Sequence, residues 1–392
     1  MKLNDLPQSF VDELIGIRRD IHANPELGFE ELRTSALVVE KLKSYGVDEV
    51  HTGMAKTGVV GVIRGKRGGD AIGLRADMDA LPMQEKNSFF HASKRAKTMH
   101  ACGHDGHTTM LLGASKYLAE TRNFAGTVHV IFQPAEEGGG GGEKMCLEGL
   151  FDRFDCKQVF GVHNRPDLDL GKWGTRVGPF MASADSFSIT INGRGGHAAR
   201  PHLVCDPMVV AANIILATQT IVSRNVSPLD TAVVGISAVE GGNLPANNVI
   251  PDTVKLAGTV RTYDPNTQDL IEARLGEMVH GICAAHRATG EFVFKRGYPP
   301  VINSKAEVEF AHSVASEIWG EANCDSNYTP SMGGEDFAYM LQMRPGCFSV
   351  IGQGAPGEPI VPLHNTRYDF CDAIIPNGVR FFSRVIERGL PL

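Results

Sequence analysis

The sequence predicts an α/β protein with a mostly parallel sheet, helices on both faces, and a smaller α+β domain inserted into it. Three observations predict this fold. Up to about residue 183, short apolar segments typical of strands alternate with segments whose apolar residues have helical spacing. The pattern changes near residue 184, and the α/β pattern resumes near residue 297. We therefore predict one domain made of residues 1–183 and 297–392, with residues 184–296 inserted between its two segments.

The first segment is predicted to contain helices and strands in the order helix, helix, strand, strand, helix, strand, strand. These elements cover residues 10–21, 30–46, 58–65, 71–77, 105–122, 126–133 and 157–163. Gly46 is placed to end the second helix, and Asp105 is placed to cap the third. Alternation of this kind is typical of a sheet whose strands are mostly parallel.

The inserted segment is predicted to fold differently. A half-exposed strand, a helix, two strands and a second helix are expected at residues 184–196, 206–224, 231–242, 252–263 and 267–286. With one further strand, this order resembles a ferredoxin-like unit. The last segment returns to the first pattern, with a strand at 347–354 and a helix at 376–388.

The composition excludes several classes of protein. Hydrophobic residues make up 42% of the 392 residues and charged residues 21%, which is enough for globular cores. The net charge of −7 and the lack of a basic run argue against a nucleic acid partner, and no apolar segment is expected to span a membrane. The eight cysteines include no CxxC pair, which is typical of reduced thiols in a cytoplasmic protein.

Polar side chains follow three of the predicted parallel strands. Asp77 and Asp79 follow one strand, Glu136 and Glu137 follow the next, and His163 ends a third. Ligands of open α/β sheets bind beyond the carboxyl ends of the strands. We therefore expect these five side chains to converge on one edge of the sheet.

The segment MHACGHDGHTTM, residues 99–110, enters a predicted helix at the same edge. Cys102 and His104 lie in it, separated by Gly103, which permits a tight turn. Thiolate, imidazole and carboxylate groups suit zinc, and also manganese, nickel or cobalt. The alternative is a buried thiol beside polar groups at a helix start, but the coincidence with the strand-end groups favours a metal site.

The adjacent carboxylates of Glu136 and Glu137 require a reason to be kept together. One can bind metal while the other acts as a general base toward water. The alternative is a solvated acidic turn. The glycines at residues 138–142 do not form a phosphate-binding loop, because the run continues as GEKM without Gly-Lys-Ser/Thr.

Two other histidines are ambiguous in their own surroundings. His364, in VPLHNTRYDF, is by itself typical of a loop histidine. His197, in GRGGHAARPH of the inserted domain, is equally compatible with a capping or surface position and with a functional one.

A series of motifs occurs in a characteristic order along the chain: IHANPELGFEE, RADMDALP, MHACGHDGHT, FQPAEEGGGG, GVHN, GRGGHAARPH, GGNLPANNVIP, GTVRT, GGEDFAY and LHNT. Together they resemble the hippurate hydrolase branch of the co-catalytic metallopeptidases, which also include carboxypeptidase G and the aminoacylases. The resemblance extends over nearly the whole chain, and HACGHD together with QPAEE is its most specific part.

The resemblance implies two divalent metal ions per subunit, bound in the larger domain. The residues that match the ligands are Cys102, His104, Glu137, His163 and His364. Cys102 matches the bridging ligand. Asp77 stands where relatives in the peptidase branch have a ligand histidine, so it is not counted as a ligand.

The resemblance also implies catalytic and assembly roles. Glu136 matches the general base, and Asp79 matches an aspartate that supports the site from behind the ligands. His197 matches a histidine that reaches the active site of the other subunit. The inserted domain resembles the dimerisation domain of the family, so a homodimer is implied, with a tetramer as the alternative.

The implied reaction is hydrolysis of an N-acyl amino acid, such as hippurate or an acetyl-amino acid, to a carboxylate and a free amino acid. Arg261 and Asn247 are candidates for holding the substrate carboxylate, although either could be structural. Glu335 and His107 receive no role. A dipeptidase or aminopeptidase with the same metals, a non-catalytic metal-binding protein and a cysteine hydrolase with Cys102 as nucleophile remain alternatives.

Overall fold

The computed structural model describes residues 2–355 and 357–392. The chain divides into two compact units. The first comprises Met1–Phe180, Ile302–Pro330 and Asp336–Leu392, and the second comprises Met181–Val301 and Ser331–Glu335.

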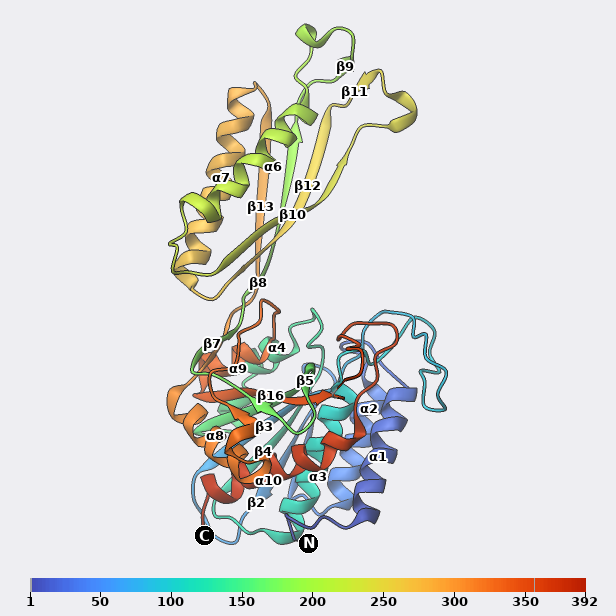
Figure 1. The fold of residues 1–392 in the computed structure, drawn as a ribbon, viewed down its shortest axis with the longest axis vertical. Helices are drawn as coiled ribbons and strands as arrows, with labels where there is room; N and C mark the ends of the chain where they lie inside the picture. Colours follow the sequence, from blue (N-terminus) through green and yellow to red (C-terminus); the bar gives the residue numbers. More distant parts are fainter. Residues whose placement is uncertain (1, 356) are drawn as a thin grey trace. The chain divides into compact units, whose positions relative to one another are not determined.

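An eight-stranded sheet runs through the first unit (Figure 1), with strand order β1-β2-β4-β3-β5-β16-β6-β15. The strands are β1 (Glu49–Met54), β2 (Gly58–Arg64), β3 (Ala71–Asp77), β4 (Thr127–Gln133), β5 (Gln158–Asp169), β6 (Trp173–Gly174), β15 (Cys324–Asp325) and β16 (Gly346–Gly354). The central strands β4, β3, β5 and β16 are parallel, which confirms the predicted mostly parallel sheet. Strand β1 was not predicted, and β2 pairs antiparallel with both of its neighbours.

Helices cover both faces of this sheet. They are α1 (Gln8–Ala23), α2 (Leu32–Ser44), α3 (His104–Thr121), α4 (Gly141–Leu147), α5 (Leu150–Arg153), α8 (Lys305–Trp319), α9 (Phe337–Met343) and α10 (Ile375–Gly389). Figure 1 shows α4 and α9 on the side of the sheet away from α3 and α10. Leu14 of α1, Leu111 of α3 and Phe381 of α10 are buried in one core with residues of the strands, so apolar burial joins the N- and C-terminal helices of this unit.

Helix α3 begins at His104, directly after Gly103. Gly103 has a left-handed backbone (φ 99°), which glycine adopts without steric strain. The prediction that Asp105 caps this helix is wrong, because no side chain caps it. The Asp105 carboxylate instead faces Arg18 and His22 of α1, and a buried carboxylate is held more strongly by charged partners than by backbone N–H groups.

The second unit contains a four-stranded antiparallel sheet with strand order β10-β12-β8-β13. Its elements are β8 (Ala184–Asn192), α6 (Pro207–Arg224), β10 (Ala232–Gly241), β12 (Thr253–Thr262), α7 (Pro265–Ala285) and β13 (Thr289–Tyr298). Short strands β9 (Gly196–His197) and β11 (Val249–Ile250) pair with each other, as do β7 (Gly178–Met181) and β14 (Val301–Asn303). The βαββαβ order is that of a ferredoxin-like unit.

One face of this second sheet is buried by α6 and α7, which lie side by side in Figure 1. Phe187, Ile189 and Ile191 alternate along β8 with more exposed residues. They share a buried core with Ile214 of α6 and Leu275 of α7. The period of two along the strand therefore gives the sheet one apolar face for the helices.

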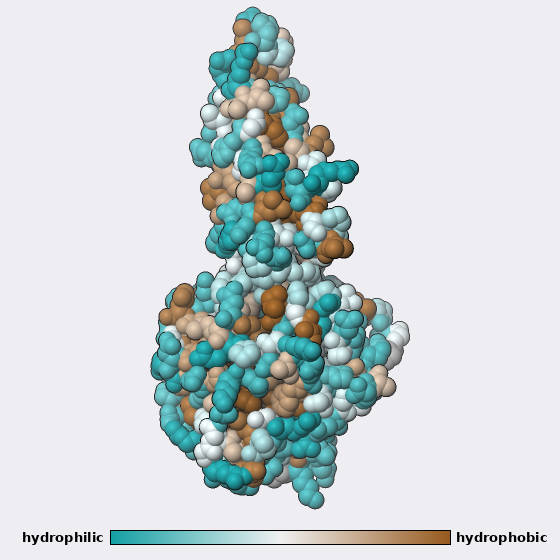
Figure 2. Space-filling model, turned by 90° about the vertical axis from the view of Figure 1, so that its left-hand side faces the viewer, coloured by the Kyte–Doolittle hydropathy of each residue, from teal (hydrophilic) through white to brown (hydrophobic). Residues whose placement is uncertain are grey.

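Helix α6 is, among the described residues, the one helix long and apolar enough to cross a membrane by length and composition alone. In addition to its buried face, α6 exposes Met208, Val209 and Leu216. One such helix is weak support for a membrane span, because a helix packed on a sheet passes the same test. On the face of the second unit that Figure 2 shows, apolar groups are interspersed with hydrophilic ones.

The packing of α3 against α1 and α10 can be tested at Gly113. A Cβ added there would lie 2.5 Å from Cγ2 of Val379 and 2.8 Å from Cδ1 of Leu14. We expect Gly113→Ala to destabilise the protein by about 1–3 kcal/mol through overpacking, measured as a lower midpoint of thermal unfolding. Gly16→Ala in α1 is the matched control, because a Cβ there meets nothing within 4 Å and alanine favours the helix. A midpoint for Gly113→Ala at or above that of Gly16→Ala would contradict this packing.

Candidate metal centre

The carboxyl ends of β3 and β4 and the middle of β5 bring the predicted site residues together. The prediction that His163 ends its strand is wrong, because β5 continues to Asp169 and pairs with β16 beyond His163. Asp77 at the end of β3 pairs in register with Gln133 at the end of β4. In β5, Gly161 pairs with Arg75, so His163 extends to the level of Asp77. This convergence follows from the parallel register of the strands.

Cys102 is shared by two groups of possible metal ligands. Its Sγ and ring nitrogens of His104 and His163 lie within 4.8 Å of one another. The same holds for its Sγ with ligand atoms of Glu137 and His364. A thiolate common to two such groups is positioned to bridge two cations.

Several of these atoms are oriented as ligands rather than as hydrogen-bond partners. Nε2 of His104 is buried without a hydrogen bond, and Asp77 Oδ2 lies 3.7 Å from it. Oε1 of Glu137 lies 3.0 Å from Nε2 of His364, but the two atoms lack hydrogen-bond alignment. Buried polar atoms without partners are costly, and a cation between them would satisfy them. The residues therefore fit a metal centre.

Asp79 supports this cluster from behind. Its Oδ1 lies 3.1 Å from Nδ1 of His104, which leaves Nε2 of that ring to face the cluster. Its Oδ2 accepts a hydrogen bond of 2.9 Å from the backbone N–H of Glu137. One carboxylate thus orients a histidine and fixes the backbone of a neighbouring carboxylate residue, the usual task of groups behind metal ligands.

Asp77 and His107 form a second supporting pair. Asp77 Oδ1 lies 2.6 Å from Nδ1 of His107, and Arg75 donates to Oδ2 at 2.8 Å. Nε2 of His107 lies 2.7 Å from Oδ1 of Asn164, and its ring packs against that of His163 with centroids 4.5 Å apart. Although Asp77, His104 and His107 also lie within 4.8 Å of one another, the Arg75 guanidinium opposes a cation at Asp77.

His107 was given no role by sequence reasoning, but a local signal was available. It lies one helical turn after His104 in α3, so both side chains occupy the same face of that helix. Burial, followed by the charge of the neighbouring His107, holds the pKa of His163 well below its ordinary value. His163 is therefore neutral, as a metal-binding imidazole must be.

The electrostatics of the cluster favour a cation. Burial would lower the pKa of His104, but the carboxylates of Asp77 and Asp79 outweigh burial and raise this pKa to about 10. Burial, and then the charge of Glu137, raises the pKa of Cys102 well above its ordinary value. The excess of carboxylates therefore holds protons that a divalent ion would displace on binding.

His364 reaches the cluster from the last chain segment. It has a left-handed backbone (φ 62°), which is uncommon for a residue with a side chain and typical of functional positions. Its backbone N–H donates to the carbonyl of Ala101 at 2.8 Å, directly beside Cys102. This contact brings the segment of His364 to the loop that carries the thiol.

Glu136 is buried after β4, where its carboxylate lies within 4.8 Å of ligand atoms of His104 and Glu137. The other three predicted site residues belong to the second unit. His197 and Asn247 are exposed there, and Arg261 lies half-buried on β12. Their roles remain predictions.

Comparison with known proteins gives consistent findings. Residues 73–388 match the family described as peptidase family M20/M25/M40. The chain is 43% identical over 369 residues to a hippurate hydrolase of Campylobacter jejuni, covering 94% of each chain. It is 42% identical over 345 residues to an N-acetyl-L-cysteine deacetylase of Bacillus subtilis, covering 87% of this chain and 80% of that one. A solved structure of a dinuclear metal-binding peptidase of the M20 family from Bacillus subtilis is similar over 98% of this chain and 99% of its own, with a TM-score of 0.84 and 33% identity.

Replacement of Cys102 tests whether the two ligand groups share a thiolate. We expect Cys102→Ala to lose bound metal from both groups, measured by elemental analysis after dialysis against a weak chelator, because a shared ligand contributes to both cations. Cys347→Ala, which removes another buried thiol of the same unit, is the matched control and should retain its metal. Equal metal content in the two variants would remove Cys102 from the ligand set.

Proposed function

Because the chain belongs to peptidase family M20/M25/M40, we propose that it is a metal-dependent amidohydrolase that cleaves N-acyl amino acids to a carboxylate and a free amino acid. The observation that carries this proposal is the position of Cys102 between two ligand groups, with Glu136 beside them. Two relatives of high coverage support the substrate class, since hippurate and N-acetyl-L-cysteine are both N-acyl amino acids.

The proposed centre holds two divalent cations. One would be bound by Cys102, His104 and His163, and the other by Cys102, Glu137 and His364. Sulfur, nitrogen and oxygen ligands together suit zinc, manganese, nickel or cobalt. When bound, such ions lower the pKa of a water molecule and polarise a carbonyl group.

Residues of the chain supply the proton transfers. Glu136 takes a proton from the attacking water and returns it to the amine that leaves, as a general base and then a general acid. Glu137, whose backbone N–H donates to Asp79, would be occupied as a metal ligand and would not be available for this task. The neighbouring carboxylates are assigned different roles because Glu137 lies in a ligand group with Cys102, whereas Glu136 does not.

The second unit is proposed to act on the substrate and in assembly. His197 donates a hydrogen bond to the carbonyl oxygen of a substrate held by the neighbouring subunit of a homodimer, where it stabilises developing negative charge. Arg261 or Asn247 binds the carboxylate of the amino acid part of the substrate. The location proposed for the enzyme is the cytoplasm.

A substrate panel with a chelator tests the function. The purified protein should hydrolyse hippurate and N-acetyl amino acids much faster than free dipeptides, and EDTA should abolish the activity. Faster cleavage of dipeptides would identify a peptidase with the same metals. Activity that survives complete removal of metal would favour a cysteine hydrolase instead, and metal binding without any hydrolysis would favour a binding protein.

Glu136→Gln tests the general base. We expect turnover to fall by about a thousandfold or more, because the amide cannot accept the proton, while the metal content stays near that of the wild type. Glu137→Gln is the matched neighbour and should lose metal instead. Near-native turnover in Glu136→Gln, measured on protein of known metal content, would show that another group is the base.

His197→Ala tests the proposed contribution between subunits. We expect unchanged metal content and a drop in turnover of about a hundredfold, the usual scale for the loss of one hydrogen-bond donor to developing charge. Mixing this variant with Glu136→Gln under conditions of subunit exchange should then restore activity to about a quarter of the wild-type value, because half of the dimers are mixed and each holds one intact site. Exchange without recovery would assign His197 to its own subunit or to a structural role.

A further inference from the structure

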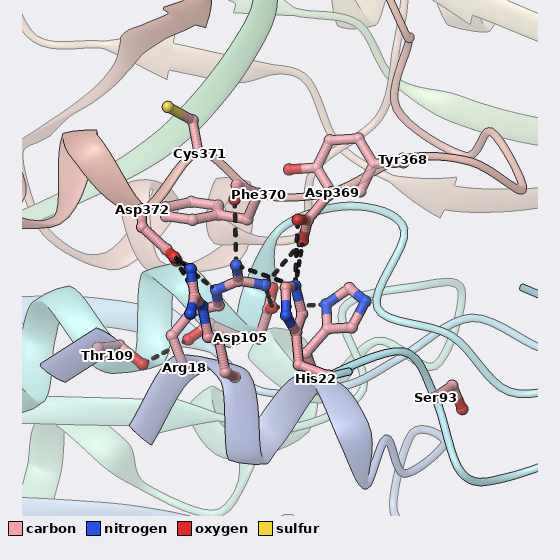
Figure 3. Close-up of polar contacts among 12 residues, drawn as sticks. Arg18, His22, Ser93, Asp105, Thr109, Tyr368, Asp369, Phe370, Cys371 and Asp372 are labelled. Atoms are coloured by element: carbon pink, nitrogen blue, oxygen red, sulfur yellow. Dashed lines mark hydrogen bonds and ion pairs between the residues drawn. The ribbon is translucent and has the colours of Figure 1, made fainter. Parts of the chain in front are cut away.

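Helix α1 carries a fully buried arginine that contacts three carboxylates (Figure 3). The exposed fraction of Arg18 is 1%. Its Nη1 lies 2.8 Å from Asp369 and 3.4 Å from Asp105, and its Nε lies 2.7 Å from Asp372. One guanidinium nitrogen of Arg18 therefore joins the carboxylates of Asp369 and Asp105, and a second nitrogen of the same group contacts the carboxylate of Asp372.

His22 follows one turn later on α1 and strengthens the same cluster. Its Nδ1 lies 2.8 Å from Asp105, and its Nε2 lies 3.3 Å from Glu85. Burial would lower the pKa of His22, but the charge of Asp105 outweighs it and raises this pKa to about 9. At neutral pH His22 is therefore cationic and donates from both ring nitrogens, so Asp105 is held by two cations of α1.

The carboxylates around Arg18 belong to the two chain segments that carry proposed metal ligands. Asp105 directly follows His104 in the first turn of α3. Asp369 and Asp372 lie on the segment that begins with His364. None of the atoms of α1 belongs to a ligand group, yet one of its side chains connects the two segments that must meet at the cations.

A contribution of this ion-pair cluster to the stability of the fold does not by itself account for the arrangement. Burying an arginine with several carboxylates has a large desolvation cost, and well-packed apolar residues often stabilise a protein as well or better. A polar link of this kind does, however, fix the distance and direction between the segments that it joins. That property matters where ligands from different segments must converge.

We propose that Arg18 is a positioning residue of the metal centre, which holds the segment of His364 in register with the segment of Cys102 and His104. This inference rests on the proposed ligand set. It has an asymmetric consequence, because His104 and His163 are placed by α3 and β5, whereas His364 lies on a loop. Loss of the link should therefore lower the affinity for the cation bound by His364 more than the affinity for the other cation.

Two variants weaken the link with little change in volume, although the first leaves the pair of Arg18 with Asp372 in place. Asp369→Asn removes one charge from a carboxylate that is 32% exposed, and Arg18→Lys retains the charge but loses the fork that reaches several carboxylates. Zinc per chain is measured by elemental analysis across a series of buffered free-zinc concentrations, with the thermal midpoint recorded for each variant. Arg33→Gln is the matched control, since it removes a guanidinium that pairs with Asp20 of α1 and with none of the three carboxylates around Arg18. His364→Ala serves as the reference for loss of the ligand itself.

We expect the wild type and Arg33→Gln to hold two zinc ions, and both link variants to bind one of the two about 10- to 100-fold more weakly, the usual effect of changing a group behind a metal ligand. His364→Ala should lose the same ion. Unchanged affinity for both ions in both link variants would overturn the positioning role and leave the metal centre intact. Equal weakening of both ions with a lowered midpoint would also overturn it, in favour of a purely structural role. A wild type that binds no zinc, manganese, nickel or cobalt would overturn the proposed function itself.

Discussion

The first unit depends on one constraint: the negative charges buried at the carboxyl ends of its parallel strands must be compensated by positive charge. Asp77, Asp79 and Glu136 are almost fully buried there, and Glu137 is only slightly exposed. Ionised carboxylates at such density are not stable in a medium of low dielectric constant unless cations accompany them. Arg75 compensates Asp77 directly, but the carboxylates of Asp79 and Glu137 face histidine nitrogens and a thiol. The demand for further positive charge is thus a property of the fold, and divalent cations are the groups that best meet it among ligands of this kind.

The same constraint explains why remote chain segments meet in this unit. Arg75 of β3 contacts Asp336, which directly precedes α9, and Arg18 of α1 contacts carboxylates of α3 and of the last segment. The second unit is inserted between β5 and β16 in sequence, yet these strands pair in parallel from Val159↔Gly346 onward. The insertion therefore does not interrupt the sheet that places the site. Buried charges and continuous strand pairing, rather than proximity in sequence, assemble the edge where the proposed ligands converge.

Local patterns in the sequence were informative where the structural cause is also local. The groups at the strand ends, with Cys102 and His104, could be predicted because apolar segments end directly before polar residues and the register of parallel strands brings these ends together. His364 could not be found from its own surroundings, since its left-handed backbone and its contact with the loop of Cys102 depend on a distant segment. Asp105 was misinterpreted as a helix cap for the same reason. Its partner Arg18 lies 87 residues away, and the sequence near Asp105 gives no indication that a buried guanidinium contacts it.

The division of residues between the units separates two parts of the proposed chemistry. All five proposed ligands and the proposed base belong to the first unit, whereas His197, Asn247 and Arg261 belong to the second. Ligand changes should therefore alter metal content, whereas changes in the second unit should alter turnover or substrate affinity on a fully loaded enzyme. A fold shared by enzymes of different specificity does not by itself determine the substrate, because specificity depends on the groups that contact it. The residues proposed to contact the substrate lie on the ferredoxin-like unit, whereas the proposed metal centre would supply the part of the reaction that any amide substrate requires.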